Sequence, residues 1–227
     1  MHSQYNYRQT LERLIDDRTR WLDIGCGHTI FPEWMRDSVP AQKELLSRCE
    51  SAVGWDPVDD RPHVAGLMKQ VSPGPALPFA DQSFNLVTAN MVVEHVDDPI
   101  AFVSEVHRLL SDGGLLAIHT PNLHYFEVFA AHLLPNAVVR KVAHLVDGRN
   151  DDDIFETHYR MNTRKAFERL PGFKVLELEP VETAPQFGKV PLLNLVESMM
   201  IRSLRSESLR RFRADWIAVL QKTPANP

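Results

Sequence analysis

The chain has 227 residues and a formal net charge of −5 at pH 7. Hydrophobic residues make up 44% of it and charged residues 24%, the proportions of an ordinary globular domain, which excludes a disordered or fibrous protein. The acidic balance argues against a nucleic-acid partner. No apolar run approaches the ~18 residues of a membrane span. Because the first residues lack the apolar stretch of a secretory signal, we expect a cytoplasmic protein.

The two cysteines, Cys26 and Cys49, limit the chemistry further. They are too few for a disulfide framework or a cysteine-only zinc site. We expect no metal site, and the sequence does not indicate an oligomeric state.

The first half of the chain alternates between short apolar runs and helical patterns. Tyr7, Leu11 and Ile15 recur at helical spacing and predict an opening helix. Pro32 and Pro40 predict two short helical pieces between the first two strands. Strands are expected over 20–24, 52–56, 68–71, 84–90 and 115–119. A helix should begin at Asp98 and Pro99, which suit an N-cap and a first turn, and should end at Gly113 and Gly114.

The alternation breaks after Pro121. Residues 122–162 stay apolar, and we interpret them as an insertion of two helices and an acidic loop that forms a lid or substrate-binding segment. We expect one domain over 1–227. Later elements are a helix over 163–170, a strand over 173–178, an amphipathic helix with Leu192, Leu195, Val196, Met199 and Met200, and a closing strand over 216–220. This order predicts an α/β fold with a doubly wound, mostly parallel sheet.

A glycine turn follows the first expected strand. Asp23, Gly25 and Gly27 stand where that strand should give way to a helix, and glycine permits close approach of a ligand there. A dinucleotide fingerprint would require a third glycine at the position of Ile30. The turn instead resembles D-x-G-x-G-x-G, the first motif of class I S-adenosylmethionine-dependent methyltransferases, with Thr29 in place of the last glycine. A plain glycine turn after a core strand is the alternative.

A carboxylate ends the second expected strand. Asp56 stands where an acid can accept hydrogen bonds from the ribose hydroxyls of an adenosine. Its separation from Asp23 is longer than the usual about 20 residues, and the extra helical pieces between them can take up the excess. An ordinary Asp-Pro turn is the alternative.

Two longer segments carry a more specific resemblance. Residues 77–87 resemble the LPF-x-D-x-SFD-x-V segment of the type 11 methyltransferase family, with Asn85 in place of the second Asp. Residues 94–99 resemble its EHV-x-DP segment, and Gly113 and Gly114 its turn before the fifth strand. The resemblance covers roughly residues 7–122. It implies a Rossmann-like seven-stranded sheet, with S-adenosylmethionine as cofactor and S-adenosylhomocysteine as product.

The resemblance also implies roles in cofactor binding. The backbone of Gly25, Cys26 and Gly27 would lie against the methionine and ribose, with Asp23 organising the turn. Asp56 would accept hydrogen bonds from the ribose hydroxyls, and Pro57 would lie beside the adenine. Further implied contacts come from Asn90, near the sulfur, and from Arg8, against the carboxylate, although a solvated arginine is the alternative for Arg8.

One feature of the family's adenine site is missing. The acid that commonly precedes the LPF segment is replaced by Pro73, Gly74, Pro75 and Ala76. We therefore expect the backbone around Ala76 and Leu77 to supply the adenine contact. The missing acid also favours an alternative, a methyltransferase-like binding protein that has lost catalysis.

Two histidines are candidate catalytic bases. His95 follows Glu94 just past the fourth strand, at the mouth of the implied cofactor pocket. His158 lies in a stretch that resembles F-x-T-x-YR-x-NT of bacterial type 11 relatives, after a segment matched by Gly148 and Arg149. Tyr159 and Arg160 beside it suit a polar substrate. The alternatives are structural: His95 ordering a helix start, and the 155–163 stretch pinned to the sheet.

The acceptor is constrained only in part. Methyl transfer mainly requires an acceptor atom about 3 Å from the methyl carbon and the exclusion of water. The N/D-PP-Y/F motif of amino-methylating enzymes is replaced here by residues 89–92, and neither cysteine suits attack on a cytosine ring. We expect O-methylation of a small or medium acceptor, namely a glycan, quinone-like or lipid-linked metabolite. C- or N-methylation of a small molecule is an alternative.

Two surface features leave alternatives open. The apolar stripe within 122–150 packs on the core or a partner, or forms a lid for a bulky acceptor that touches a membrane surface. Five arginines opposed only by Glu207 form either a phosphate or anionic-carrier site or a solvated helix face: Arg202, Arg205, Arg210, Arg211 and Arg213.

Overall fold

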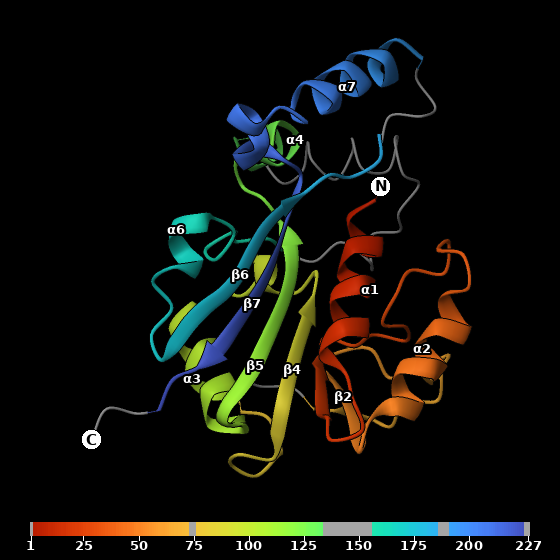
Figure 1. The fold of residues 1–227 in the computed structure, drawn as a ribbon, viewed down its shortest axis with the longest axis vertical. Helices are drawn as coiled ribbons and strands as arrows, with labels where there is room; N and C mark the ends of the chain where they lie inside the picture. Colours follow the sequence, from red (N-terminus) through yellow and green to blue (C-terminus); the bar gives the residue numbers. More distant parts are fainter. Residues whose placement is uncertain (1, 73–75, 134–155, 186–190, 225–227) are drawn as a thin grey trace.

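The computed structural model describes residues 2–72, 76–133, 156–185 and 191–224. Its centre is a seven-stranded sheet with the order β3-β2-β1-β4-β5-β7-β6. Figure 1 shows β6, β7, β5 and β4 side by side. The strands are β1 Arg20–Ile24, β2 Ser51–Asp56, β3 Lys69–Val71, β4 Phe84–Asn90, β5 Leu110–Pro121, β6 Phe173–Val181 and β7 Asp215–Lys222. The helices are α1 Ser3–Leu14, α2 Ser38–Arg48, α3 Pro99–Leu109, α4 Phe126–Leu133, α6 Arg164–Phe167 and α7 Pro191–Ser203, with 3₁₀ turns η1 Val93–His95 and η3 Glu207–Phe212.

The sheet is mostly parallel, as the strand and helix alternation predicts. β1 pairs in parallel with both β2 and β4, and β4 with β5. β7 is the exception, since it runs antiparallel between β5 and β6. The carboxyl ends of β1, β2, β4 and β5 therefore meet at one edge, where open α/β sheets bind their ligands.

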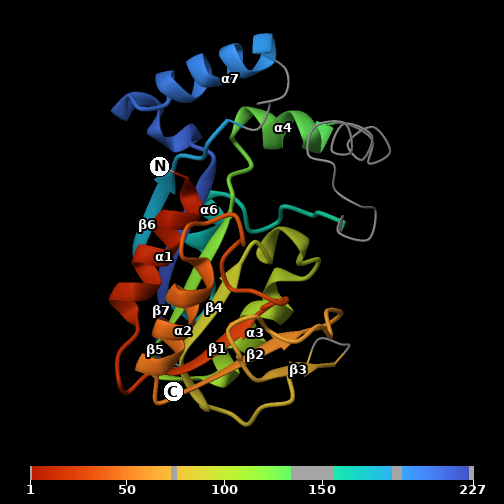
Figure 2. The same ribbon diagram turned by 90° about the vertical axis from the view of Figure 1, so that its right-hand side faces the viewer.

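Helices cover both faces of the sheet, and β1 shows how its residues divide between them. Leu22 and Ile24 pack in the hydrophobic cluster that includes Val103, Val106 and Leu109 of α3 and Phe167 of α6. Trp21 packs in the other cluster, with Tyr7 and Leu11 of α1 and Leu45 of α2. Figure 2 shows α1 and α2 on one side of the sheet and α3 on the other. This two-sided burial explains why the strands are continuously apolar.

The predicted start of α3 is confirmed, but its predicted end at Gly113 and Gly114 is wrong, because α3 ends at Leu109 and both glycines lie within β5. The Asp98 side chain accepts hydrogen bonds from the backbone N–H groups of Ile100 and Ala101, so it is the N-cap of α3. Between β1 and β2, however, the structure has the single helix α2 rather than two helical pieces. Pro40 lies in the first turn of α2, where a backbone N–H has no helical partner in any case, so it does not split the helix.

The insertion is described only in part. α4 begins just after β5 and lies beyond the carboxyl ends of the strands, near α7 (Figures 1 and 2). The predicted second helix and the acidic loop, with Gly148 and Arg149, lie outside the described residues. Within the described residues, no helix is both long and apolar enough to cross a bilayer.

Candidate active site

The turn after β1 requires glycine at its first position. Gly25 has a φ of +66°, and a Cβ built there would lie 2.4 Å from Val92 Cγ2. The backbone N–H of Gly25 donates to the carbonyl of Trp55 at 2.7 Å, which ties the turn to the end of β2. Gly27 has a φ of +50° with more open space around it. Both the left-handed backbone and the contact with Val92 therefore exclude a side chain at position 25.

Asp56 at the end of β2 is held by backbone donors. Its Oδ2 accepts from the N–H of Gly27 at 3.0 Å. Its Oδ1 accepts from the N–H groups of Val58 at 3.0 Å and Asp59 at 2.7 Å. A carboxylate offers about four acceptor positions, so the second lone pair of Oδ2 is the one these bonds leave for a ligand hydroxyl. A second hydroxyl would have to displace one of the three N–H groups.

A cavity of about 500 Å³ opens beside this turn, a volume within the range of small-molecule sites. Its lining consists of residues 25–29, Asp56 and residues 58–61. Charged groups surround it. The Arg61 guanidinium beside Asp59 holds the pKa of that carboxyl well below its usual range. Lys69 Nζ donates to the carbonyl of Gly27 at 2.8 Å and lies 3.7 Å from Asp59 Oδ1.

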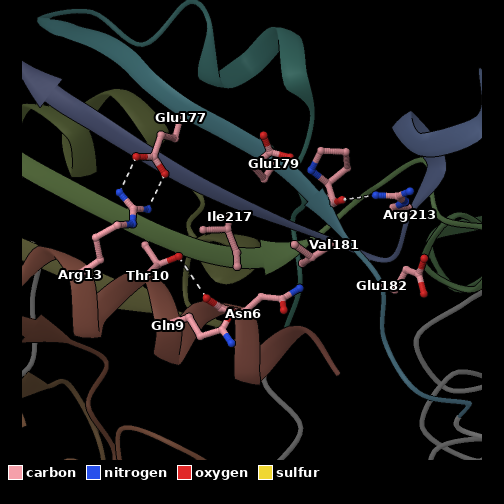
Figure 3. A pocket seen from close by; sticks show the side chains of 11 residues that line it. Asn6, Gln9, Thr10, Arg13, Glu177, Glu179, Val181, Glu182, Arg213 and Ile217 are labelled. Atoms are coloured by element: carbon pink, nitrogen blue, oxygen red, sulfur yellow. Dashed lines mark hydrogen bonds and ion pairs between the residues drawn. The ribbon is translucent and has the colours of Figure 1, made fainter. Parts of the chain in front are cut away.

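A second cavity of similar size, about 520 Å³, lies between α1 and β6. Figure 3 shows Arg13 forming two hydrogen bonds to Glu177 at one end of it, at 2.7 and 2.6 Å. Its other two carboxylates, Glu179 and Glu182, pair with Arg210 and Arg205. It has no glycine turn and no strand-end carboxylate held by backbone donors. The cavity beside Gly25 is therefore the candidate cofactor site.

Asp23 lies beneath the turn rather than in the cavity lining. It is buried, and its Oδ1 accepts from Thr88 Oγ1 at 2.5 Å. Trp21 Nε1 in turn donates to Thr88 Oγ1 at 2.7 Å. Burial raises the pKa of Asp23 to about 7, and the nearby Asp56 adds to the rise. Asp23 thus links β1 to β4 under the glycine turn, a position that suits the organising role that the resemblance implies.

Cys26 lines the cavity, whereas Pro57, Leu77 and Arg8 are absent from its lining. Burial raises the pKa of the Cys26 thiol well above its usual range, so this cysteine is no nucleophile. Pro57 is exposed. Leu77 donates its N–H to Glu105 Oε1 at 2.8 Å, so this group is already engaged. Arg8 pairs with Glu12 one turn along α1, at 2.7 Å. Their roles toward the cofactor stay predictions.

Asn90, at the end of β4, is part of a polar cluster that the sequence analysis missed. Its Nδ2 donates to the carbonyl of Ile30 at 2.9 Å, which orients the amide. Its Oδ1 accepts from His119 Nδ1 at 2.8 Å. His119 is fully buried at the end of β5, stacks on Tyr7 and lies 3.6 Å from Asp215. Asn90 and His119 are partners in the β4–β5 register, which the sequence alone does not give.

The two candidate bases come together at the same edge of the sheet. The N–H groups of His158 and Tyr159 both donate to the carbonyl of Glu94, at 2.7 and 3.1 Å. His95 Nδ1 lies 2.7 Å from the carbonyl oxygen of Glu156. A carbonyl only accepts, so Nδ1 carries the proton and Nε2 is the basic nitrogen of a neutral ring. Burial lowers the pKa of His95 by more than the hydrogen bond to Glu156 raises it, and the nearby His158 adds to the lowering.

Charged side chains hold the 156–160 segment in place. Arg160 bonds to Asp97 twice, with Nη2 2.8 Å from Oδ1 and Nη1 2.6 Å from the backbone carbonyl. His158 Nδ1 lies 3.8 Å from the same carboxylate. Arg160 therefore acts as an anchor between the insertion and the loop after β4, and Asp97 is a site residue that the sequence analysis did not single out.

A buried acid supports this segment from below. Glu94 Oε2 accepts from Thr120 Oγ1 at 2.8 Å, and Asn162 Nδ2 donates to the same hydroxyl oxygen at 2.7 Å. Burial raises the pKa of Glu94 to about 7. These bonds join the loop after β4, the end of β5 and the end of the insertion at the carboxyl edge of the sheet.

Comparison with known proteins places this geometry in a family. Residues 1–177 match the family model described as a methyltransferase domain. The chain belongs to the methyltransferase-domain family. Family membership confirms the resemblance to S-adenosylmethionine-dependent methyltransferases and makes S-adenosylmethionine the cofactor of this domain.

Named relatives of this methyltransferase domain differ in how much they align. A ubiquinone biosynthesis O-methyltransferase of Pseudomonas aeruginosa is 27% identical over 200 residues, 81% of this chain and 77% of the relative. An uncharacterized methyltransferase of Schizosaccharomyces pombe is 29% identical over 112 residues, 46% of this chain. That alignment spans 40% of the relative's length. A ubiquinone/menaquinone biosynthesis C-methyltransferase of Geotalea uraniireducens is 36% identical over 48% of this chain and 49% of the relative.

Solved methyltransferase structures share the fold. A geranyl diphosphate methyltransferase in complex with SAM superposes with a TM-score of 0.57 at 14% identity, over 97% of this chain and 85% of that one. An S-adenosylmethionine-dependent methyltransferase of Mesorhizobium loti superposes with a TM-score of 0.54 at 18% identity, over 94% and 96% of the two chains. These likenesses confirm the Rossmann-like fold of this methyltransferase domain.

The site fits the cofactor of the family. The cavity beside Gly25 is lined by the backbone of the glycine turn and by the Asp56 carboxylate. Asp56 still has an acceptor position for a ribose hydroxyl, and position 25 has no room for a side chain. Gly25, Gly27 and Asp56 are accordingly the residues that would hold S-adenosylmethionine.

Proposed function

We propose that this domain methylates a hydroxyl group of a small quinone-like acceptor, which binds at the edge of the sheet where the 94–97 loop meets the 156–160 segment. The Pseudomonas O-methyltransferase supports an oxygen acceptor, because its alignment covers most of both chains. The polar side chains of His95, His158 and Arg160, which lie at the same edge of the sheet, support a polar acceptor. The glycan and lipid-linked acceptors of the sequence analysis are the competing substrates in the test below.

The observation that carries this proposal is the orientation of His95. The bond from Nδ1 to the Glu156 carbonyl fixes the ring and leaves Nε2 as its basic nitrogen. Because the pKa of His95 is lowered, the ring is neutral at physiological pH and able to accept a proton. A base has this use when the acceptor is a hydroxyl, since methylation of oxygen releases its proton.

The proposed reaction divides the work between the bound cofactor and the chain. S-adenosylmethionine supplies an electrophilic methyl carbon on its sulfonium. With the methyl group supplied by the bound cofactor, which would leave as S-adenosylhomocysteine, His95 would accept the proton that the acceptor hydroxyl loses. His158 orients the acceptor from the insertion side, and Arg160 holds that segment in place through Asp97. Gly25, Gly27 and Asp56 bind the cofactor and hold its methyl group in position for the acceptor.

The test compares matched acceptors with the purified chain. S-adenosylhomocysteine release is measured with a catechol-type quinol, with the same ring bearing methoxy groups instead of hydroxyls, and with a glycan and a polyprenyl-linked alcohol. We expect release with the quinol and none with the blocked ring. Mass spectrometry and NMR of the product identify the methylated atom.

The same experiment separates two other functions. C-methylation is a second candidate, because the Geotalea relative is named for it. A ring carbon methylated in the product would establish it and overturn the hydroxyl proposal. A protein that binds S-adenosylmethionine in a calorimetric titration but turns over none of these acceptors would instead support a binding protein without catalysis.

A further inference from the structure

Helix α7 is turned with its apolar stripe to solvent. It buries Glu197 and Ile201, while Leu192 is 71% exposed, Leu195 58% and Met199 65%. Three further apolar side chains of the helix are also exposed: Leu193, Val196 and Met200. A helix that packs on a core normally buries its apolar face and exposes its charges. Here a continuous apolar patch faces outward, and such patches mark interaction surfaces.

A positive charge continues the same stripe. Leu192, Leu195, Met199 and Arg202 follow at spacings of three, four and three residues, so they share one side of the helix. Arg205 and Arg210 pair with Glu182 and Glu179 of the β6 region. Neither Arg202 nor Arg211 forms an ion pair with any carboxylate of the described residues. The outward side of α7 carries no carboxylate, because its one acid, Glu197, is buried.

The place of α7 connects this surface to the site. Figures 1 and 2 show α7 with α4 at the end of the molecule beyond the carboxyl ends of β4 and β5. Phe129 of α4 is a further exposed apolar side chain at this end. The apolar and basic surface thus lies at the end of the domain that also holds the carboxyl ends of the central strands.

We propose that α7 docks in the plane of a membrane surface that contains anionic lipids. Leucine, valine and methionine side chains enter the boundary between headgroups and acyl chains, and Arg202 at the end of the stripe meets lipid phosphate. Charge favours this occupant over a second copy of the chain. An isologous contact through the stripe would bury Arg202 against a face that offers no carboxylate to pair with it. The proposal is independent of which atom the domain methylates.

The test measures co-sedimentation of the whole chain with two kinds of vesicle. One contains phosphatidylcholine alone, and in the other phosphatidylglycerol replaces about a third of the lipid. We expect partitioning to the anionic vesicles that weakens as salt rises. Leu195→Glu should weaken it about tenfold or more, because a carboxylate replaces a side chain that enters the apolar layer. Arg202→Gln should weaken binding about fivefold on anionic vesicles and leave the residual binding to neutral ones unchanged.

Leu176→Glu is the matched control, since Leu176 is an exposed leucine on β6 and receives the same substitution. It should partition like the parent. Circular dichroism and thermal unfolding confirm that each variant is folded. Absence of vesicle binding by the parent protein would overturn the proposal. So would equal binding by Leu195→Glu, or a concentration-dependent dimer that Leu195→Glu dissociates, which would assign the stripe to a second copy.

Discussion

The backbone N–H of His158 donates to the carbonyl oxygen of Glu94 at 2.7 Å. This bond joins the end of the insertion to the loop after β4, although a helix, a strand and the insertion itself separate the two residues along the chain. It brings two candidate bases from distant motifs together at the carboxyl edge of the sheet. The hydrogen bond uses only backbone atoms, so side-chain substitutions of either histidine leave this join intact.

The two histidines should separate by their effect on turnover. His95→Ala removes the oriented base, and we expect turnover to fall by about 10²–10⁴-fold while S-adenosylmethionine binding changes little. His158→Ala should have the larger effect on KM if its role is to orient the acceptor. His124→Ala is the control, because His124 is an exposed histidine of the same insertion. If both site variants turn over like the parent, catalysis rests on alignment alone.

Asp56 should govern cofactor affinity. Asp56→Ala removes a charged acceptor worth roughly 1.5–3 kcal/mol, so S-adenosylmethionine should bind about tenfold to a hundredfold more weakly in a calorimetric titration. The backbone N–H groups of Gly27, Val58 and Asp59 also lose their acceptor, so thermal unfolding must accompany the titration. Asp17→Asn, at an exposed acid, is the control. Unchanged affinity in folded Asp56→Ala would contradict the assignment.

The glycine turn allows a test by added volume. Gly25→Ala places a methyl group 2.4 Å from Val92 Cγ2 at a φ of +66°. We expect cofactor binding to be lost and the protein to be destabilised. The double variant with Val92→Ala removes the overlap but not the backbone strain, so it should recover part of both. Gly66→Ala has a φ of +80° with no atom within 4 Å and reports the strain alone. Equal effects at positions 25 and 66 would refute the close contact.

Burial of Glu94 predicts a dependence of stability on pH. Its pKa is about 7 in the folded chain against an ordinary value of 4.5 for a glutamate. Between these values the folded carboxyl keeps a proton that the unfolded chain has lost. Its contribution is therefore full below pH 4.5 and is lost as the pH rises through about 7.

Glu94→Gln cannot ionise and keeps an acceptor for Thr120. From about pH 5 to about pH 8, the free energy of unfolding of this variant should rise relative to the parent by roughly 1–3 kcal/mol. Chemical denaturation at several pH values measures it. Glu44→Gln, at an exposed position, should show a constant difference from the parent. A constant difference for Glu94→Gln as well would mean that this carboxyl is not protonated in the folded state.

Local patterns predicted most of the fold. The bounds of β1 and β4 coincide with their apolar runs, and Asp98 caps α3 as expected. Pro40 shows the limit of local rules, since proline breaks a helix only beyond its first turn. The direction of the α7 stripe shows another limit. Helical spacing places Leu195 and Met199 on one face, but only the packing of Glu197 and Ile201 decides that this face points outward.

The sequence by itself determined the glycine turn, the strand-end carboxylate and the family motifs, because each depends on residues close together in the chain. Only the tertiary structure decided that Val92 packs against Gly25 and that Asp56 accepts hydrogen bonds from three backbone N–H groups. It also decided that His119 forms a hydrogen bond to Asn90. These relationships join strands that are neighbours in the sheet but distant in the sequence. Strand order and register set them, and no local pattern of residues encodes either.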